Sequence, residues 1–337
     1  MVKGSALTPA RRLGWALLGL TGVLWIVVAV AVSTGYQAIT WRELQESETA
    51  RTIFFQLRIP RVLLAILVGA ALSSVGAALQ ALFRNPLAEP FTLGVSGGGA
   101  LGASIAIALG FGASLGGVPL IFLMAFAGSA LFVTIVYRLA SSGPVFLPGA
   151  LLLAGVVLNL IAGAGVLMIQ FVTDYTRALQ ILRWMVGTLD VVGMDLVWRM
   201  ALFLLPGLFL LLYSARDLHL IAMDEEAAAA LGVDVRRVER TVYAASSLVV
   251  GVAVAVAGPI GFVGLIVPHA IRLLFGEDLR MVIPCSMLLG AGFLVATDTL
   301  ARTLLGASEL PVGAITALAG GPLFLVLLSR KTRYAAI

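Results

Sequence analysis

Apolar runs of membrane-spanning length recur along almost the whole chain, and they constrain its fold more than any other feature. A helix needs roughly 20 consecutive apolar residues to cross a hydrocarbon core about 30 Å thick. Only 12% of the 337 residues are charged, against about 25% in an average soluble domain. We therefore expect an all-α, polytopic membrane protein with a single transmembrane domain over residues 1–337. The expected crossings are approximately 12–33, 60–83, 92–110, 118–138, 148–171, 194–213, 241–258, 262–275, 281–301 and 311–329.

The number of crossings sets the sidedness of the chain. Ten crossings place both termini on one side of the membrane, and Lys and Arg are enriched in cytoplasmic segments. The basic residues near the two ends are Lys3, Arg11, Arg12, Arg330, Lys331 and Arg333. We expect both termini in the cytoplasm, and the run at 12–33 is an uncleaved first span because it is longer than the apolar core of a typical signal peptide. The crossing at 262–275 is the shortest, and whether it spans the bilayer fully stays open.

Residues 216–240 form a charged island between the sixth and seventh expected crossings, on the cytoplasmic side. Ten charged side chains fall within RDLHLIAMDEEAAAALGVDVRRVER. Positions 225–231 are rich in Ala, the best helix former, and Gly232 suits the end of a helix. We predict a short helix there and a second one from about Val235. The acidic residues before it complement the positive end of its dipole, and Ala and Leu stand where a solvated loop would be polar. This pattern favours a binding surface for a soluble partner.

A weak internal repeat is present. The residues Gly69, Gly76, Pro86 and Gly94 recur as Gly251, Gly258, Pro268 and Gly276, each 182 positions later (251 minus 69). Five crossings lie within that displacement, so the two copies, approximately 58–190 and 240–330, would have opposite orientations. Inverted repeats of this kind are common in transporters. Chance matches in a chain with 37 glycines are the alternative.

Three arginines stand at the outer end of the bundle, against the positive-inside bias. Arg58 and Arg61 flank Pro60 at the entrance of the second crossing, which we expect to begin near Arg61, and Arg302 ends the ninth. Two interpretations are open. The arginines either anchor to headgroups or pair internally, Arg302 with Asp298 one turn before it, or they await acidic residues of an external partner.

At the inner end, the segment Arg84-Asn85-Pro86-Leu87-Ala88-Glu89-Pro90 predicts a tight turn, because two prolines four residues apart exclude a continuous helix. A stiff turn at this place is either a gate or a simple loop.

Several classes of function are disfavoured by the residues themselves. Cys285 is the only cysteine, and His219 and His269 lack carboxylates at ligand spacing, so we expect no metal site, no cofactor and no catalytic centre in this chain. The basic residues do not cluster with aromatic ones, which argues against nucleic-acid binding. The phosphate-binding pattern G-x-x-x-x-G-K-[ST] is missing, so the chain is not an ATPase. An ion-coupled secondary transporter would need intramembrane carboxylates, and Asp298 is the clear candidate.

A set of motifs from about residue 50 to 330 carries a family resemblance. These are Arg58-Ile59-Pro60-Arg61, Asn85-Pro86-Leu87-Ala88-Glu89-Pro90, Leu93-Gly94-Val95-Ser96, Ala230-Leu231-Gly232-Val233, Gly258-Pro259-Ile260-Gly261-Phe262-Val263-Gly264-Leu265-Ile266-Val267-Pro268-His269, Ala301-Arg302 and Glu309-Leu310-Pro311-Val312-Gly313. In this order, the motifs resemble the FecCD-type permeases, the membrane subunits of binding-protein-dependent ABC importers for iron–siderophores, haem and cobalamin.

The resemblance implies ten helices per subunit, a dimer around a central pore in the bacterial inner membrane, and a second permease copy that is identical or homologous. It also implies a cytoplasmic ATPase dimer that carries ATP and Mg, and a periplasmic or lipid-anchored binding protein. By position, Arg58, Arg61 and Arg302 resemble cations that meet acidic residues of the binding protein. The resemblance assigns ATPase coupling to Asp224, Glu225, Glu226, Ala229, Leu231 and Gly232. It assigns a cytoplasmic gate to Asn85, Pro86 and Leu87, with a second gate loop in the Ser141–Pro148 connection.

The cargo is not fixed by the sequence. Sparse polar residues in the spans, such as Asn159 and Gln170, suggest a passage without a fixed high-affinity site. We expect an iron–siderophore, with haem or cobalamin as the alternatives within the same importer type.

Overall fold

The computed structural model describes residues 9–35, 41–140, 148–304 and 309–334. Lys3 and nearly all of the Ser141–Pro148 connection lie outside these residues. The elements are α1 (Pro9–Ser33), α2 (Trp41–Glu46), α3 (Glu48–Thr52), the π-helix η1 (Ile53–Arg58), α4 (Ile59–Leu82), the 3₁₀ helix η2 (Pro90–Leu93), α5 (Val95–Ala108), β1 (Ser114–Leu115), β2 (Val118–Pro119), α6 (Leu120–Ala140), α7 (Pro148–Val172), α8 (Tyr175–Val186), α9 (Asp195–Met223), α10 (Glu225–Ala230), α11 (Val235–Ala257), α12 (Val263–Phe275), α13 (Leu279–Thr303) and α14 (Val312–Tyr334).

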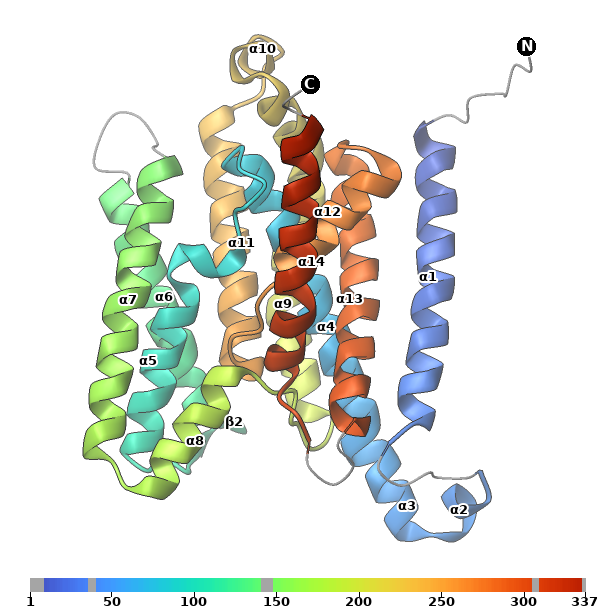
Figure 1. The fold of residues 1–337 in the computed structure, drawn as a ribbon, viewed down its shortest axis with the longest axis vertical. Helices are drawn as coiled ribbons and strands as arrows, with labels where there is room; N and C mark the ends of the chain where they lie inside the picture. Colours follow the sequence, from blue (N-terminus) through green and yellow to red (C-terminus); the bar gives the residue numbers. More distant parts are fainter. Residues whose placement is uncertain (1–8, 36–40, 141–147, 305–308, 335–337) are drawn as a thin grey trace.

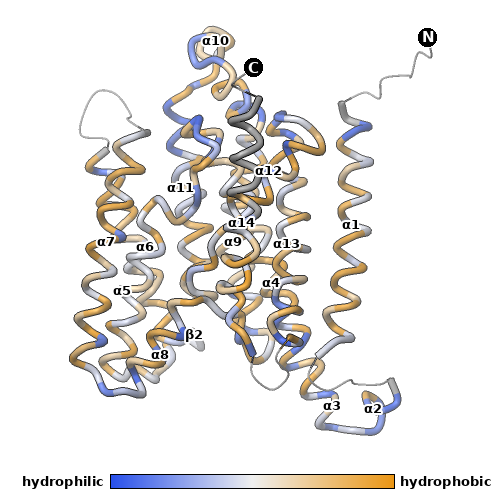
Figure 2. Tube along the Cα trace, viewed as in Figure 1, coloured by the Kyte–Doolittle hydropathy of each residue, from blue (hydrophilic) through white to orange (hydrophobic). Residues whose placement is uncertain are grey.

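The expected membrane bundle is confirmed. Each of the ten predicted crossings corresponds to a helix, and in the described part of the chain seven helical runs are long and apolar enough to cross a membrane. Two shorter apolar helices, Val95–Ala108 and Val263–Phe275, and the apolar first part of α14, Val312–Pro322, complete the set. The helices run side by side, with apolar residues along their middles and polar residues towards the two ends (Figures 1 and 2).

The uncertain eighth crossing, α12, has only 13 residues. At about 1.5 Å per residue it reaches roughly 20 Å, too short for a hydrocarbon core of about 30 Å. It therefore does not span the bilayer by itself.

Helix α4 forms the centre of the bundle. It packs against α13, α9, α11 and α12. Its most apolar 18-residue window is 78% buried, whereas the corresponding window of α1 is only 11% buried. Helix α1 therefore lies at the edge of the bundle, where Figure 1 places it beside α13.

The start of the second crossing differs from the prediction. The helical run begins at Glu48 rather than near Arg61, and Pro60 lies inside it. Proline has no N–H to donate and its ring clashes within a regular helix. The chain accommodates it with the π-helical turn η1, in which the N–H of Ile59 bonds to the carbonyl of Phe54, five residues back.

The consecutive helices α4 and α5 cross the bundle in the opposite order to the consecutive helices α11 and α12. Helix α4 runs towards the end that carries α10 and α5 returns, whereas α11 runs away from that end and α12 returns (Figure 1). Each short helix starts after a residue in the left-handed region, Gly94 (φ 81°) before α5 and Phe262 (φ 68°) before α12. The arrangement fits an inverted pair.

The residue matches predicted at 182 positions do not fall on equivalent sites. Gly76 lies inside α4 whereas Gly258 ends α11, and Pro86 lies in a turn whereas Pro268 lies inside α12. That register is wrong.

The charged island is more helical than predicted. Helix α9 continues to Met223, about ten residues beyond the expected end of its crossing, and α11 begins at Val235 and runs on into the membrane as one long helix rather than as a separate short one. The start of α1 and the end of α14 lie at the same end of the bundle as α10 (Figure 1). Helix α8, before α9, was not predicted.

Candidate functional site

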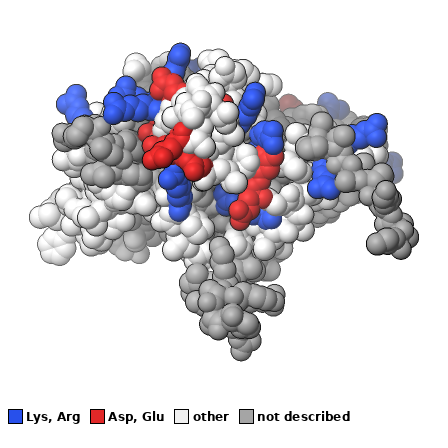
Figure 3. All heavy atoms as spheres, turned by 90° about the horizontal axis from the view of Figure 1, so that it is seen from above, with Lys and Arg blue, Asp and Glu red and all other residues white. Residues whose placement is uncertain are grey.

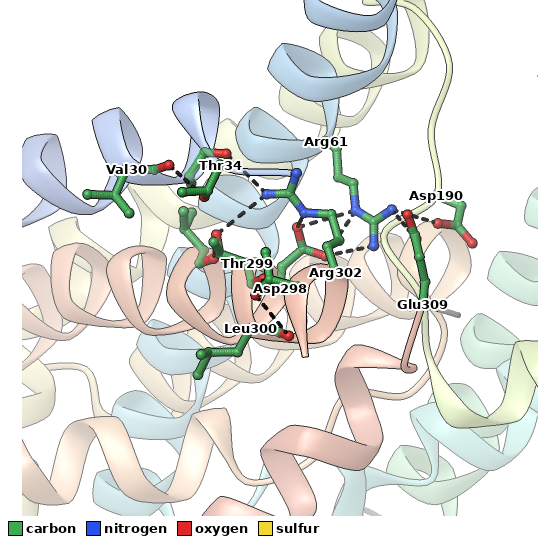
Figure 4. A network of polar contacts seen from close by, with 12 residues as sticks. Val30, Thr34, Arg61, Asp190, Asp298, Thr299, Leu300, Arg302 and Glu309 are labelled. Carbon is green, nitrogen blue, oxygen red and sulfur yellow. Dashed lines mark hydrogen bonds and ion pairs between the residues drawn. The ribbon is translucent and has the colours of Figure 1, made fainter. Parts of the chain in front are cut away.

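An ion-pair network occupies the end of the bundle opposite α10 (Figure 4). At its centre Asp298 of α13 is 1% exposed. Arg61 of α4 donates from Nε to the Asp298 carboxylate at 3.0 Å, and its Nη2 lies 3.0 Å from the same group. Arg302 reaches Asp298 Oδ2 with Nε at 3.0 Å from one turn further along α13. A buried carboxylate therefore joins α4 to α13 through two guanidinium groups.

Arg302 and the third arginine, Arg58, both contact the backbone of α1. Arg302 Nη2 donates to the carbonyl of Ala31 at 3.3 Å, and Arg58 Nη1 donates to that of Val32, also at 3.3 Å. Both arginines are 6% exposed. They hold the end of α1 against the central helices; Arg302 makes the expected pair with Asp298, and Arg58 also has an internal contact, whereas a role of either in docking stays a prediction.

Arg61 extends further outwards, to two acidic residues that the sequence analysis did not single out. Its Nη1 lies 2.7 Å from Glu309 Oε2 and 3.2 Å from Asp190 Oδ1. The carboxylates are half-exposed or more, with side chains 51% and 65% accessible. Glu309 stood within a quoted motif, Glu309–Gly313, but nothing in the spacing indicated its partner 248 positions away.

A cavity of about 730 Å³ opens beside this network. Its polar lining comes from Arg61, Asp190 and Glu309 and, from α8, Gln180 and Arg183. Arg61, one of the three predicted docking arginines, therefore lines this cavity, although its charge is already met by three carboxylates.

At the opposite end, helix α10 forms where the sequence predicts it, with Gly232 after its last turn, and Asp224, expected there only for its charge, also caps it. Asp224 Oδ1 accepts a hydrogen bond from the N–H of Ala227 at 2.9 Å, and Gly232 has φ 88° after the last turn. Both features are standard for helix termini. Seen from this end, basic and acidic side chains gather around the protruding segment (Figure 3).

Helix α10 has an inner and an outer face. Ala228 is 1% exposed and faces the bundle, whereas Glu226 and Ala229 are exposed. Leu231 is 72% exposed at the tip, and Met223, just before the helix, is 76% exposed. A protruding segment with apolar side chains at its tip has the character of a protein-binding surface.

The predicted gate turn lies next to this segment. Asn85 Oδ1 accepts from the N–H of Leu87 at 2.9 Å, and the N–H of Ala88 bonds to the carbonyl of Asn85 at 3.0 Å. Leu87 is 48% exposed and Pro86 is also exposed. The turn contacts the charged island through Arg84, a residue that the motif contained but that had received no role.

The carboxylate of Glu89 closes the far end of the turn. Its Oε1 accepts a hydrogen bond from the N–H of Phe262 at 2.6 Å. Burial raises the pKa of the Glu89 carboxyl above its ordinary value, and the hydrogen bond from Phe262 offsets part of that rise. The gate turn is thus joined to the start of the short helix α12.

The described residues hold no group of three or more His, Cys, Asp and Glu side chains that could bind a metal. His219 lies 4.0 Å from Asp278, and Cys285 is buried. Asn159 is used internally, because its side chain bonds to the N–H of Gly97 and the carbonyl of Phe91.

Comparisons with known proteins agree with this architecture. The hemin transport system permease protein HmuU of Yersinia pestis is 38% identical over 324 residues, which cover 94% of this chain and 96% of that protein. The vitamin B12 import system permease protein BtuC of Klebsiella pneumoniae is 37% identical over 321 residues, covering 95% of each chain. A solved structure described as an inward-facing conformation of a metal-chelate type ABC transporter superposes with a TM-score of 0.83 at 33% identity, over 94% of this chain and 99% of that one.

The family model named FecCD transport family matches residues 20–330, nearly the entire membrane bundle. Together with the relatives, this match shows that the chain belongs to the FecCD transport family and is an ABC importer permease.

Proposed function

We propose that the chain is the membrane-spanning permease of an importer for an organic metal chelate, with an iron–siderophore as the first expectation and haem or cobalamin as the alternatives. The relatives named for hemin and vitamin B12, and the solved metal-chelate transporter, support a large chelate as the class of cargo. The observation that carries the transport assignment is the central, nearly buried α4, which runs from the Arg61 network at one end to the gate turn at the other.

Two copies of the chain, identical or homologous, would enclose the passage. Helix α7 supports this, because it exposes a long apolar face that includes Leu160, Leu167 and Phe171. Such a face offers no fixed charge to hold cargo. Specificity then lies in a separate binding protein, periplasmic or lipid-anchored, that delivers the chelate.

A cytoplasmic ATPase dimer, which carries ATP and Mg, would supply the energy. The protruding α10 with exposed Leu231 supports this role, as does the missing phosphate-binding pattern in this chain. The basic pair Arg11 and Arg12 at the start of α1 supports a cytoplasmic location of the α10 end and of both termini, in a bacterial inner membrane, by the positive-inside bias.

The opposite end would then receive the binding protein. Of Arg58, Arg61 and Arg302, we favour Arg61, because it lines the open cavity and contacts two exposed carboxylates, whereas Arg58 and Arg302 are buried. Charge reversal at Arg61 is expected to weaken docking, provided that membrane insertion of the variant is unchanged. If a properly inserted Arg61→Glu variant binds the binding protein as tightly as the wild type does, Arg61 has no role in docking.

An ion-coupled secondary transporter is the competing class. Its coupling carboxylate would be Asp298, but this group is held by Arg61 and Arg302 at 3.0 Å each. A carboxylate fixed between two arginines is poorly placed to bind and release an ion.

Reconstitution in proteoliposomes tests the assignment. The permease, the ATPase and the binding protein of the same importer are combined, and uptake of radiolabelled iron–siderophore, haem and cobalamin is measured with and without internal ATP. Uptake of one chelate that requires ATP and the ATPase is expected. Uptake driven by an ion gradient without the ATPase would overturn the proposal.

A further inference from the structure

Arg84 connects the gate turn to the segment proposed to bind the ATPase. Its Nη2 lies 3.1 Å from Glu225 Oε2, in the first turn of α10. The same nitrogen donates to the carbonyl of Ile221 at 2.9 Å, in the last turn of α9. One guanidinium group therefore contacts both helices that flank the start of the protruding segment.

The backbone directs Arg84 to this position. It follows the end of α4 with φ 48°, in the left-handed region that few residues other than glycine adopt. Its N–H bonds to the carbonyl of Ala81 at 3.1 Å, and the N–H of Asn85 bonds to that of Gln80 at 3.0 Å. The chain thereby turns sharply, and the side chain of Arg84 crosses to α9 and α10.

The gate turn is short and internally bonded, so a displacement at one end is carried to the other. Asn85 bonds to both Leu87 and Ala88 within the turn, and Glu89 bonds to Phe262 beyond it. Because these hydrogen bonds restrain the turn, a displacement of Arg84 would move Asn85–Leu87 with it.

The ion pair between Arg84 and Glu225 is too exposed to contribute much to the stability of the fold, which indicates another role. The side chains of Arg84 and Glu225 are 51% and 54% accessible. Exposed ion pairs contribute about 0–1 kcal/mol to stability. Meanwhile the outer face of α10, with Glu226, Ala229 and Leu231, stays available for a partner.

We propose that Arg84, through its contacts with Glu225 and Ile221, transmits displacement of α10 to the gate turn Asn85–Leu87. This inference rests on the proposed function, because it takes the gate and the ATPase contact from it. Arg84 is a positioning residue, since it contacts neither cargo nor nucleotide. Its loss uncouples the two events and leaves each of them intact.

The test measures how many ATP molecules are hydrolysed per cargo molecule imported by the complete importer in proteoliposomes. The variants are Arg84→Glu, Glu225→Arg and the double exchange. Each single variant is expected to raise the ratio about threefold or more, as expected for loss of an exposed ion pair, with normal insertion and thermal stability. In the double exchange, the ratio is expected to fall part of the way back to the wild-type value, because the exchange restores the ion pair but not the hydrogen bond to the carbonyl of Ile221.

A matched control is the exchange of Arg42 and Glu46. These residues form another exposed Arg–Glu pair, at 3.0 Å, at the opposite end of the protein. This exchange is expected to leave the ratio unchanged. An unaltered ratio in both single variants, or a double exchange no better than either, overturns the inference. Failure of the proposed function is distinguishable, because it shows in the wild-type importer as uptake that needs no ATPase.

Discussion

Gly76 of α4 lies directly against the backbone of Gly264 of α12. A Cβ atom built at Gly76 would stand 1.9 Å from the carbonyl oxygen of Gly264, and one at Gly69 would stand 2.3 Å from that of Gly290 on α13. Small residues in membrane helices permit this close approach, which replaces the hydrophobic driving force available in water. Backbone atoms cannot move aside as a flexible side chain can.

Gly76→Ala is therefore expected to destabilise the protein by more than the roughly 1–3 kcal/mol typical of overpacking. Thermal unfolding in detergent measures the loss. Gly14→Ala on α1 is the control, because nothing lies within 4 Å of its added Cβ. Equal melting temperatures for the two variants would contradict the close packing of α4 on α12.

Removing the charge of Asp298 should destabilise the end of the bundle opposite α10. Asp298→Asn leaves Arg61 and Arg302 close together without the carboxylate they share, and loss of one partner of a buried pair costs about 3–5 kcal/mol. The melting temperature in detergent should fall by several degrees. Glu46→Gln, in an exposed pair with Arg42, is expected to change it little. A stable Asp298→Asn variant would show that the network is dispensable for folding.

The terminal residues of α10 should matter for its attachment to a partner. Asp224→Ala removes the cap on Ala227, at a cost of about 1 kcal/mol in a helix of six residues. Gly232→Ala meets no neighbouring atom, but it places a side chain at φ 88°, which costs about 1–3 kcal/mol. Both variants are expected to bind the ATPase less tightly in a pull-down. Normal binding of both would show that the folded form of α10 is not what the ATPase recognises.

The sequence predicted the membrane-spanning helices and the end of α10 because these depend on local residues. Apolar runs located the helices at the ten expected crossings, and the Ala-rich run followed by Gly232 located α10. The network around Arg61 was beyond such reasoning. Asp190 and Glu309 lie 129 and 248 positions from it, in the segments before α9 and before α14, and only the tertiary arrangement of the bundle brings them together.

Other errors have equally physical reasons. A proline such as Pro60 commonly marks the start of a helix. Here the π-helical turn before it accommodates the missing backbone N–H, so the helical run begins earlier, at Glu48. Helix α8 was missed because its 12 residues are short and amphipathic, unlike a membrane span. The repeat register failed because glycines that permit close packing, such as Gly76, were equated with glycines that end helices, such as Gly258.

The turn between α12 and α13 should weaken in acid. Asp278 caps α13 through the N–H of Arg280, and Arg280 Nη2 lies 2.7 Å from its carboxylate. The hydrogen bonds and charge of Arg280 lower the pKa of Asp278. A lowered folded pKa stabilises the protein above the unfolded value of about 3.9, and this contribution is lost as the pH falls through the folded value.

Asp278→Asn keeps a capping side chain and removes the charge. The wild-type protein should therefore melt at a higher temperature than the variant at pH 7, and the difference should shrink as the pH falls below about 3.9, the unfolded pKa of Asp. Melting curves in detergent across this range provide the measurement. A difference that is constant with pH would mean that the Asp278 charge contributes nothing.

Glu309 should compete with an acidic partner for Arg61. Its carboxylate lies 2.7 Å from Arg61 Nη1 and is half-exposed, whereas Asp298 holds the other side of the same guanidinium. If a binding-protein carboxylate docks on Arg61, it must displace Glu309. Glu309→Gln leaves the Asp298 pair in place and is expected to tighten docking about two- to fivefold, which corresponds to the 0.5–1 kcal/mol of an exposed ion pair.

The affinity of the purified permease–ATPase complex for its binding protein measures this effect, at low and at high salt. Glu46→Gln is the matched control, because it removes the same charge from the same end of the protein without touching Arg61. Its affinity should equal that of the wild type, and the gain from Glu309→Gln should shrink in high salt as screening weakens every exposed pair. Weaker docking of Glu309→Gln would reverse the assignment, because Glu309 itself would then be the group that the binding protein contacts.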